Sequence, residues 1–228
     1  MKNKFALLGC LVMALFVYTP LLQAQTPSTT LPKPFVEETS KEAKELFGAL
    51  KKKHLAMKGI SLDYELMIEN GDQKEKQTGT LLQTGTQYRL IMPNHEIISD
   101  AQSVWTYSKK QNEVQISDFD PSDEDLLSPN NLLNFDKTEK KFYYEITGED
   151  ANAIYIEFKP LEKKSEYAKL RFKIGKKLKD IQEIKVFTKD STRYTLTIKK
   201  LQEVVHSKDK FMFNKNAYPG VRTVDLRD

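Results

Sequence analysis

A two-residue period in hydrophobicity starts at Ile60 and shapes most of the chain that follows. The first run places apolar side chains at every second position: Ile60, Leu62, Tyr64, Leu66 and Ile68. Successive side chains of a β-strand point to opposite faces of a sheet, so this run predicts a strand with one apolar face. Asn70-Gly71-Asp72 comes next and is a strong signal for a tight hairpin turn.

The same alternation recurs in short runs bounded by turn residues. These runs lie near residues 75–83, 87–92, 95–98, 104–107, 113–117, 142–146, 154–158, 170–174 and 194–198. About ten or eleven such strands predict a mainly β protein (α+β) built on one large antiparallel sheet. A sheet of this size curls, and by this pattern only one of its faces is apolar.

Two segments have helical rather than strand spacing. Residues 40–57 follow a capping Thr39 or Ser40 and carry Ala43, Leu46, Phe47 and Leu50 on one stripe before Gly59 ends the helix. Residues 123–134 hold four leucines at helical offsets, Leu126, Leu127, Leu132 and Leu133, with Pro129 between them. This second segment predicts a short, broken helix inserted between strands.

Two short helices are too few to seal a wide apolar sheet face. We therefore expect an apolar space between the sheet and the helices, which stays dry and accepts apolar guests. The segment around Pro129 is then a movable lid. Ordinary core packing of the same side chains is the alternative that periodicity leaves open.

Residues 1–24 predict a secretory signal peptide. Lys2 and Lys4 precede an apolar stretch from Phe5 to Tyr18, and a cleavage point near Ala24 follows. The residues before Cys10 resemble a lipid-attachment box, but the apolar stretch continues beyond it, so we place Cys10 in the removed signal. The exported chain then has no cysteine and no disulfide. Residues 25–36 contain three prolines and predict a disordered tether, and residues 37–228 predict a single, soluble domain.

Charge and residue types exclude several classes of function. The net charge of +4 falls to about +2 once Lys2 and Lys4 are removed, which is no nucleic-acid footprint and favours a monomer. The three histidines, His54, His95 and His206, lie in no metal or nucleophile spacing. The acidic run at residues 118–125 lacks the spacing of a calcium loop and indicates a solvated connector. We expect no metal, no cofactor and no enzymatic activity.

Three stretches together carry a family resemblance. Residues 99–107 have the form of an S-D-G-x-x-V/L-W-x-Y hairpin, residues 128–133 that of an S-P-x-x-L-L helix, and residues 211–225 that of an F-x-F-x-P-x-G-V-x-V-x-D ending. On these motifs, which span most of the exported chain, the sequence resembles the periplasmic outer-membrane lipoprotein carriers of the LolA family.

The resemblance implies an open half-barrel sheet lidded by short helices, as in LolA and LolB. It also implies a periplasmic carrier, which takes acylated lipoproteins from an inner-membrane exporter and delivers them to an outer-membrane receptor. Relatives of the same fold that carry or sense other hydrophobic ligands of the cell envelope are the alternative. A scaffold with a filled core is a third possibility.

We expect the acyl chains to contact apolar side chains of the concave sheet face. The expected lining residues are Tyr64, Leu66, Tyr88, Leu90, Met92, Ile98, Trp105, Phe142, Tyr144 and Ile154, and the expected lid residues are Leu126, Leu127, Pro129, Leu132 and Leu133. Two departures from the family matter. Ala101 stands where relatives have Gly, which predicts a strained, positive φ. Residues 82–86 lack the basic residue before Pro that latches the lid in relatives, so no latch residue is carried over.

Overall fold

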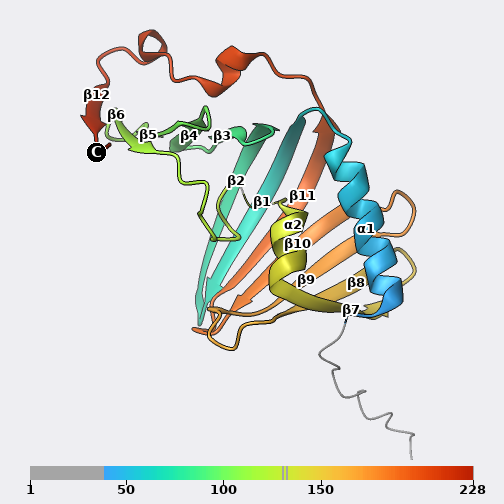
Figure 1. The fold of residues 1–228 in the computed structure, drawn as a ribbon. Helices are drawn as coiled ribbons and strands as arrows, with labels where there is room; N and C mark the ends of the chain where they lie inside the picture. The colour runs from blue at the N-terminus through green and yellow to red at the C-terminus, as the bar shows by residue number, and fades with distance from the viewer. Residues whose placement is uncertain (1–38, 130, 132, 228) are drawn as a thin grey trace, which may run out of the picture. The chain divides into compact units, whose positions relative to one another are not determined.

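The computed structural model describes residues 39–129, 131 and 133–227, and twelve strands in this part of the chain form one sheet (Figure 1). The strands are β1 (Ile60–Asn70), β2 (Gln73–Thr84), β3 (Gln87–Ile91), β4 (His95–Ser99), β5 (Ser103–Ser108), β6 (Glu113–Asp118), β7 (Phe142–Glu149), β8 (Ala153–Pro160), β9 (Tyr167–Gly175), β10 (Ile181–Thr188), β11 (Arg193–Glu203) and β12 (Arg222–Asp225). Their order across the sheet is β12-β6-β5-β4-β3-β2-β1-β11-β10-β9-β8-β7.

The sheet is open, with β12 and β7 at its two edges. Neighbouring strands pair antiparallel, apart from β12, which runs parallel to β6. In β1, Ile60, Leu62 and Tyr64 are buried and the residues between them are partly exposed, as the two-residue period predicted. The predicted mainly β fold is therefore confirmed. The predicted signal peptide, Cys10 and the tether at 25–36 lie outside the described residues.

The sequence pattern did not reveal two of the strands, β10 and β12. In β10 the pairing with β9 shifts between Ile181 and Glu183, so the apolar residues Ile181, Ile184 and Val186 do not keep a two-residue step. A bulge of this kind hides a strand from any periodicity argument. β12 has only four residues and is held by its pairing with β6.

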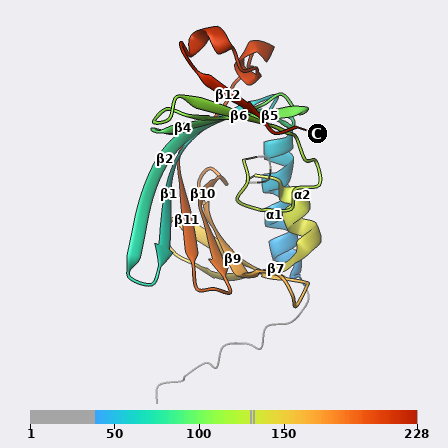
Figure 2. The same cartoon turned by 90° about the vertical axis from the view of Figure 1, so that its left-hand side faces the viewer.

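Helix α1 (Lys41–Leu55) forms where it was predicted. The Ser40 side chain caps it by accepting a hydrogen bond from the Ala43 amide at 3.2 Å. Ala43, Phe47 and Leu50 are the buried side of the helix. Figure 2 shows the sheet curving around α1 and the shorter helix α2 (Phe135–Lys141), so both helices cover its concave face.

The prediction of a broken helix at residues 123–134, here named the lid segment, is wrong. Its described residues form consecutive turns, and α2 begins only at Phe135, capped by Asn134. Aspartate side chains explain the difference. Asp123 Oδ1 accepts a hydrogen bond from the Asp125 amide at 3.0 Å, and Asp125 Oδ1 accepts one from the Leu127 amide at 2.9 Å. Such local bonds satisfy amides that a helix would otherwise need for its own ladder.

A second hydrophobic cluster lies on the opposite, convex face of the sheet. Tyr107, Val114 and Val221 form its buried part. The C-terminal segment that follows β11 covers this face, and the Tyr218 hydroxyl donates a 2.5 Å hydrogen bond to Glu96. In the turn between β4 and β5, Ala101 has a φ of 72°, which confirms the predicted strain.

Only short helices lie in the described part of the chain, and none combines the length and apolarity needed to cross a membrane.

Candidate functional site

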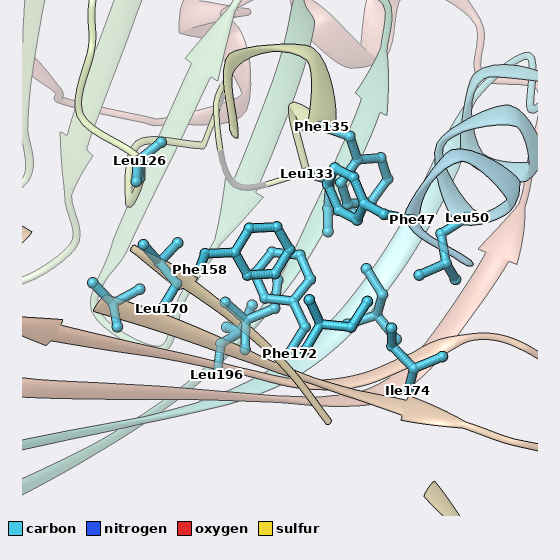
Figure 3. Close-up of a cluster of buried hydrophobic side chains, with 14 of the residues drawn as sticks. Phe47, Leu50, Leu126, Leu133, Phe135, Phe158, Leu170, Phe172, Ile174 and Leu196 are labelled. Atoms are coloured by element: carbon cyan, nitrogen blue, oxygen red, sulfur yellow. The ribbon is translucent and has the colours of Figure 1, made fainter. Parts of the chain in front are cut away.

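The main hydrophobic cluster fills the space between the concave sheet face, the two helices and the lid segment. Figure 3 shows Phe47 and Leu50 of α1, with Leu133 and Phe135, facing side chains that rise from the sheet. Phe158, Leu170, Phe172 and Leu196 are among those sheet residues, and all are buried. The same face therefore carries both the core of the domain and any site for an apolar ligand.

Under α1 this space is fully packed. The Phe47 ring lies 5.0 Å from Tyr144, 5.1 Å from Phe158, 5.6 Å from Phe135 and 6.1 Å from Phe172, measured between ring centroids. These are the tilted and edge-to-face contacts that aromatic rings favour. This half of the concave face is core and leaves no room for a ligand beside Phe47.

Under the lid segment the packing is looser. A small enclosed pocket of about 20 Å³ remains there. Its walls are mostly apolar and come from the lid segment, from α2 and from β9, β10 and β11: Leu126, Leu127, Asn131, Thr138, Leu170, Phe172, Ile184, Val186, Tyr194 and Leu196. A pocket that holds a drug-sized ligand has roughly 300–1,000 Å³, so this pocket is too small for such a ligand while the lid segment is in place.

A larger, open cleft of about 410 Å³ lies at one end of the lid segment. We name it the mouth cleft. Its apolar walls include Met57, Ile60, Phe119, Leu133 and Phe135, which all belong to the main cluster or pack against it. Charged and polar groups form the rest of its lining. The mouth cleft therefore opens onto the buried cluster.

His54 of α1 lies on the wall of the mouth cleft. Its ring meets Phe135 edge-on at 5.0 Å. Burial lowers the pKa of His54 below its ordinary value, so the neutral imidazole is favoured against this apolar wall.

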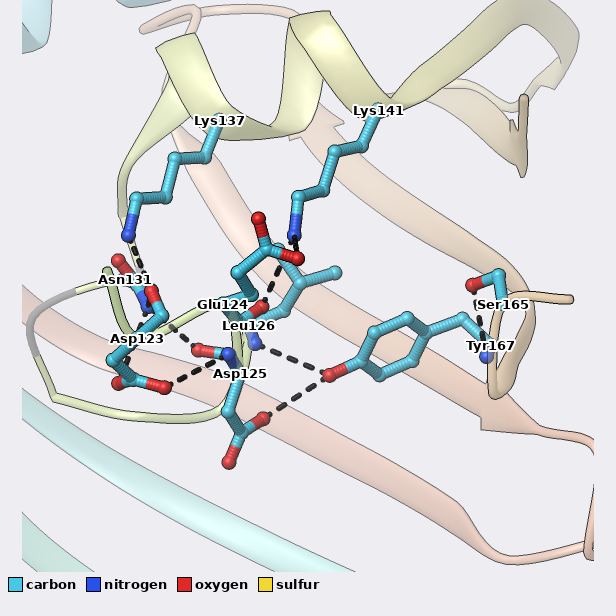
Figure 4. Close-up of polar contacts among 9 residues, drawn as sticks. All are labelled: Asp123, Glu124, Asp125, Leu126, Asn131, Lys137, Lys141, Ser165 and Tyr167. Carbon is cyan, nitrogen blue, oxygen red and sulfur yellow. Dashed lines mark hydrogen bonds and ion pairs between the residues drawn. The ribbon is translucent and has the colours of Figure 1, made fainter. Parts of the chain in front are cut away.

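Polar contacts close the lid segment at its opposite side (Figure 4). The Tyr167 hydroxyl of β9 accepts a hydrogen bond from the Leu126 amide at 3.2 Å and donates one to Asp125 at 3.1 Å. Burial raises the pKa of Tyr167, so the hydroxyl keeps the proton that it donates. Asn131 also donates to the carbonyl oxygen of Asp125, at 2.8 Å. These bonds hold the lid to itself and to the sheet.

Helix α2 adds two cationic contacts to the lid segment. Lys137 donates to the carbonyl oxygen of Asp123. Lys141 pairs with the Glu124 carboxylate at 3.0 Å. None of these contacts to the lid segment comes from the strand hairpin at residues 82–86.

The structure brings most of the predicted site residues to the concave face. Tyr64, Tyr88, Phe142 and Tyr144 belong to the buried cluster, as do Leu126 and Leu133, while Leu66, Leu90 and Leu127 pack against it. Among these, Leu126 and Leu127 line the enclosed pocket, and Leu133 lines the mouth cleft. Tyr144 contacts Phe47 and so belongs to the packed half.

Other predicted residues lie elsewhere. Ile98 pairs with Trp105 across β4 and β5, and Trp105 packs against the convex cluster, so the placement of these two in the concave lining is corrected. The prediction assumed one apolar face per strand, but this part of the sheet is apolar on both faces. Met92 follows the end of β3. Ile154, by contrast, pairs with the buried Ile174 of β9 and so lies on the concave face, where it is partly buried. Pro129 is a partly buried turn residue, and Leu132 lies outside the described residues.

The sequence analysis missed the floor of the enclosed pocket. That floor is made by Leu170 and Phe172 of β9, Ile184 and Val186 of β10, and Tyr194 and Leu196 of β11. The alternation in β9 and β11 was visible in the sequence, and only their adjacency to the lid segment was not. β10 offered no signal because its bulge breaks the period.

The concave face offers a surface for an apolar ligand. Within the described residues, no group of three or more His, Cys, Asp or Glu side chains is placed to hold a metal ion. The convergent side chains on the concave face are aliphatic and aromatic. Such a surface, covered by a segment held through hydrogen bonds, suits an apolar ligand.

Comparisons with known proteins agree with this architecture. Residues 65–214 match the family model described as outer membrane lipoprotein carrier protein LolA. No curated protein sequence matches the chain.

Among solved structures, an uncharacterized conserved protein from Thermus thermophilus is similar, with a TM-score of 0.53 and 9% identity, over 81% of this chain and 99% of that one. A DUF1329 family protein from Desulfovibrio piger has a TM-score of 0.48 and 11% identity, and the match covers 79% of this chain and 99% of that one. A LolA superfamily protein from Nitrosomonas europaea has a TM-score of 0.40 and 7% identity, and the match covers 75% of this chain and 97% of that one. At 9% identity, the likeness to the Thermus thermophilus protein is one of fold alone.

Proposed function

Because the chain belongs to the outer membrane lipoprotein carrier family LolA, we propose that it shelters the acyl chains of lipoproteins and carries them through the periplasm from the inner to the outer membrane. The acyl chains enter at the mouth cleft and lie between the lid segment and the sheet. The observation that carries this proposal is the apolar pocket under a lid that polar contacts hold shut.

The magnitudes favour a ligand that displaces the lid. Burying one methylene contributes about 0.8 kcal/mol, so a chain of about sixteen carbons contributes about 10 kcal/mol when fully sheltered. Each hydrogen bond of the lid segment contributes only about 0.5–1.5 kcal/mol net. Acyl burial therefore outweighs the few contacts, through Tyr167, Lys137 and Lys141, that join the lid segment to the sheet and to α2.

The partners follow from the same proposal. An inner-membrane exporter supplies the acylated lipoprotein, and an outer-membrane receptor accepts it. The protein itself performs no covalent chemistry on its cargo, because transfer needs only the exchange of one apolar environment for another. Export by the N-terminal signal peptide brings the carrier to the periplasm.

Mass spectrometry of the protein purified gently from its own periplasm tests the proposal. We expect co-purified triacylated lipoprotein. The variant Leu127→Glu places a charge in the pocket at a half-buried position and should abolish this co-purification, while Leu161→Glu, at an exposed turn, should not. An empty protein that also ignores added acyl chains would overturn the proposal, and free lipid alone would move it to a general lipid carrier.

A further inference from the structure

A tight turn between β9 and β10 presents an exposed leucine. Leu178 is 66% exposed and lies in the sequence Lys176-Lys177-Leu178-Lys179. A single exposed leucine on a protein surface is ordinary. Here, however, the leucine stands at the tip of a turn whose other exposed side chains are cationic, and this combination is what calls for an explanation.

The backbone of this turn holds Leu178 in place. The Lys179 amide donates to the carbonyl oxygen of Gly175 at 2.9 Å, and the Gly175 amide donates to that of Asp180 at 2.9 Å. Lys179 has a φ of 47°, a conformation that favours glycine. The turn therefore keeps a lysine at a strained position, where glycine would fit with less strain.

Helix α1 extends the cationic surface beside the turn. Lys53 Nζ donates to the carbonyl oxygen of Leu178 at 3.0 Å, and this bond joins the two elements. We define the basic patch as Lys52, Lys53, Lys177, Leu178 and Lys179, all of which are exposed.

Carboxylates near the basic patch pair with other lysines. Asp136 and Glu139 lie 2.5 and 2.7 Å from Lys51. Glu149 lies 3.0 Å from Lys176. Asp180 follows the turn directly, so the four lysines of the patch still outnumber the carboxylate beside them.

We infer that the basic patch docks the protein on the surface of an anionic lipid bilayer. The lysines contact lipid phosphates, and Leu178 enters the boundary between headgroups and acyl chains. An exposed aliphatic tip among lysines matches both layers of such a surface, whereas an acidic protein partner would need only the charges. Leu55 of α1, which is 63% exposed, and Lys58 both line the mouth cleft, so docking through α1 brings the cleft close to the membrane.

Sedimentation with vesicles tests this inference without any cargo, so its outcome is independent of the carrier proposal. The purified protein is mixed with vesicles of phosphatidylglycerol and phosphatidylethanolamine, or with vesicles of neutral phosphatidylcholine. We expect binding to the anionic vesicles alone, and its loss in high salt. Lys177→Glu/Lys179→Glu should lower binding by at least about fivefold for each lysine, and Leu178→Ser should lower it without changing the salt dependence.

The β8–β9 turn supplies a matched control. It also carries an exposed leucine, Leu161, beside the exposed Lys163 and Lys164, but Glu162 and Glu166 balance its charge. Lys163→Glu/Lys164→Glu and Leu161→Ser should leave vesicle binding unchanged. Equal loss in both turns, or no binding to anionic vesicles, would overturn the inference. Binding to anionic vesicles that depends on the lysines but not on Leu178 would overturn the part of the inference that inserts Leu178 into the bilayer.

Discussion

Replacing Tyr167 by phenylalanine should release the lid segment without disturbing the sheet. The ring stays in place, and only the hydroxyl that bonds Leu126 and Asp125 is lost. Asp125 is exposed and regains water, but Leu126 is only 5% exposed. Leaving such a buried amide without a partner costs about 1–3 kcal/mol. The ratio of open to closed lid should therefore rise by about 5- to 150-fold.

Hydrogen exchange measured by mass spectrometry reads this ratio directly, because amide exchange through local opening follows the population of the open state. Peptides covering residues 123–134 should exchange faster in Tyr167→Phe by the same factor. Peptides from β1 and β11, in the middle of the sheet, should be unaffected. A fluorescent fatty acid should also bind faster, because the lid opens more often.

Tyr155→Phe is the matched control. It too removes a tyrosine hydroxyl that donates to an aspartate: Tyr155 of β8 donates to Asp150 at 2.7 Å, in an exposed bond outside the lid segment. Its lid peptides should exchange as in the parent protein. Unchanged lid exchange in a folded Tyr167→Phe protein, or faster exchange spread evenly over the sheet, would refute the role given to this hydroxyl.

Three further outcomes are expected. Ala101→Gly removes about 1–2 kcal/mol of left-handed backbone strain and costs about 0.5–1 kcal/mol in the conformational entropy of glycine. Calorimetry should therefore show Tm rising by about 2 °C. Gly85→Ala, at a φ of 57°, should lower Tm. Phe47→Ala should lower the free energy of unfolding, measured by urea denaturation, by about 3–5 kcal/mol, because four aromatic rings surround the Phe47 side chain. Because the pKa of His54 is lowered in the folded protein, His54 of the unfolded chain takes up a proton at a higher pH than His54 of the folded chain. The contribution of this residue to the free energy of unfolding is therefore fully present above pH about 6.5 and falls as the pH drops below it. In His54→Phe the difference in Tm between pH 7.5 and pH 5.5 should shrink, and an unchanged difference would contradict this reasoning.

The fold was largely readable from the sequence, because the two-residue alternation reports directly which side chains a sheet buries. The pattern in β1, from Ile60 to Ile68, needed no tertiary information. α1 was equally readable, since its cap at Ser40 and its apolar stripe are both local features. The strain at Ala101 followed from the family resemblance, which has a glycine at this turn position.

The site was less readable, because it depends on which faces and segments come together. Ile98 and Trp105 alternate like the other strand residues, yet they lie on the convex face under the C-terminal segment. Nothing in their local sequence distinguishes the two faces. The lid segment had leucines at helical spacing, but the side chains of Asp123 and Asp125 bind the amides that a helix would have used. Local polar competition, rather than hydrophobic spacing, decided that conformation.

The parallel pairing of β12 with β6 has a consequence for self-association. An open sheet leaves a row of unpaired amides and carbonyls at each edge, which can recruit strands from other molecules. β12 covers the β6 edge and contributes a new edge of only four residues, with Arg222 and Asp225 at its ends and Arg222 paired to Glu113. A short strand with charges at its ends is a poor template for further growth. The C-terminal segment thus protects the β6 side of the sheet from pairing with further strands.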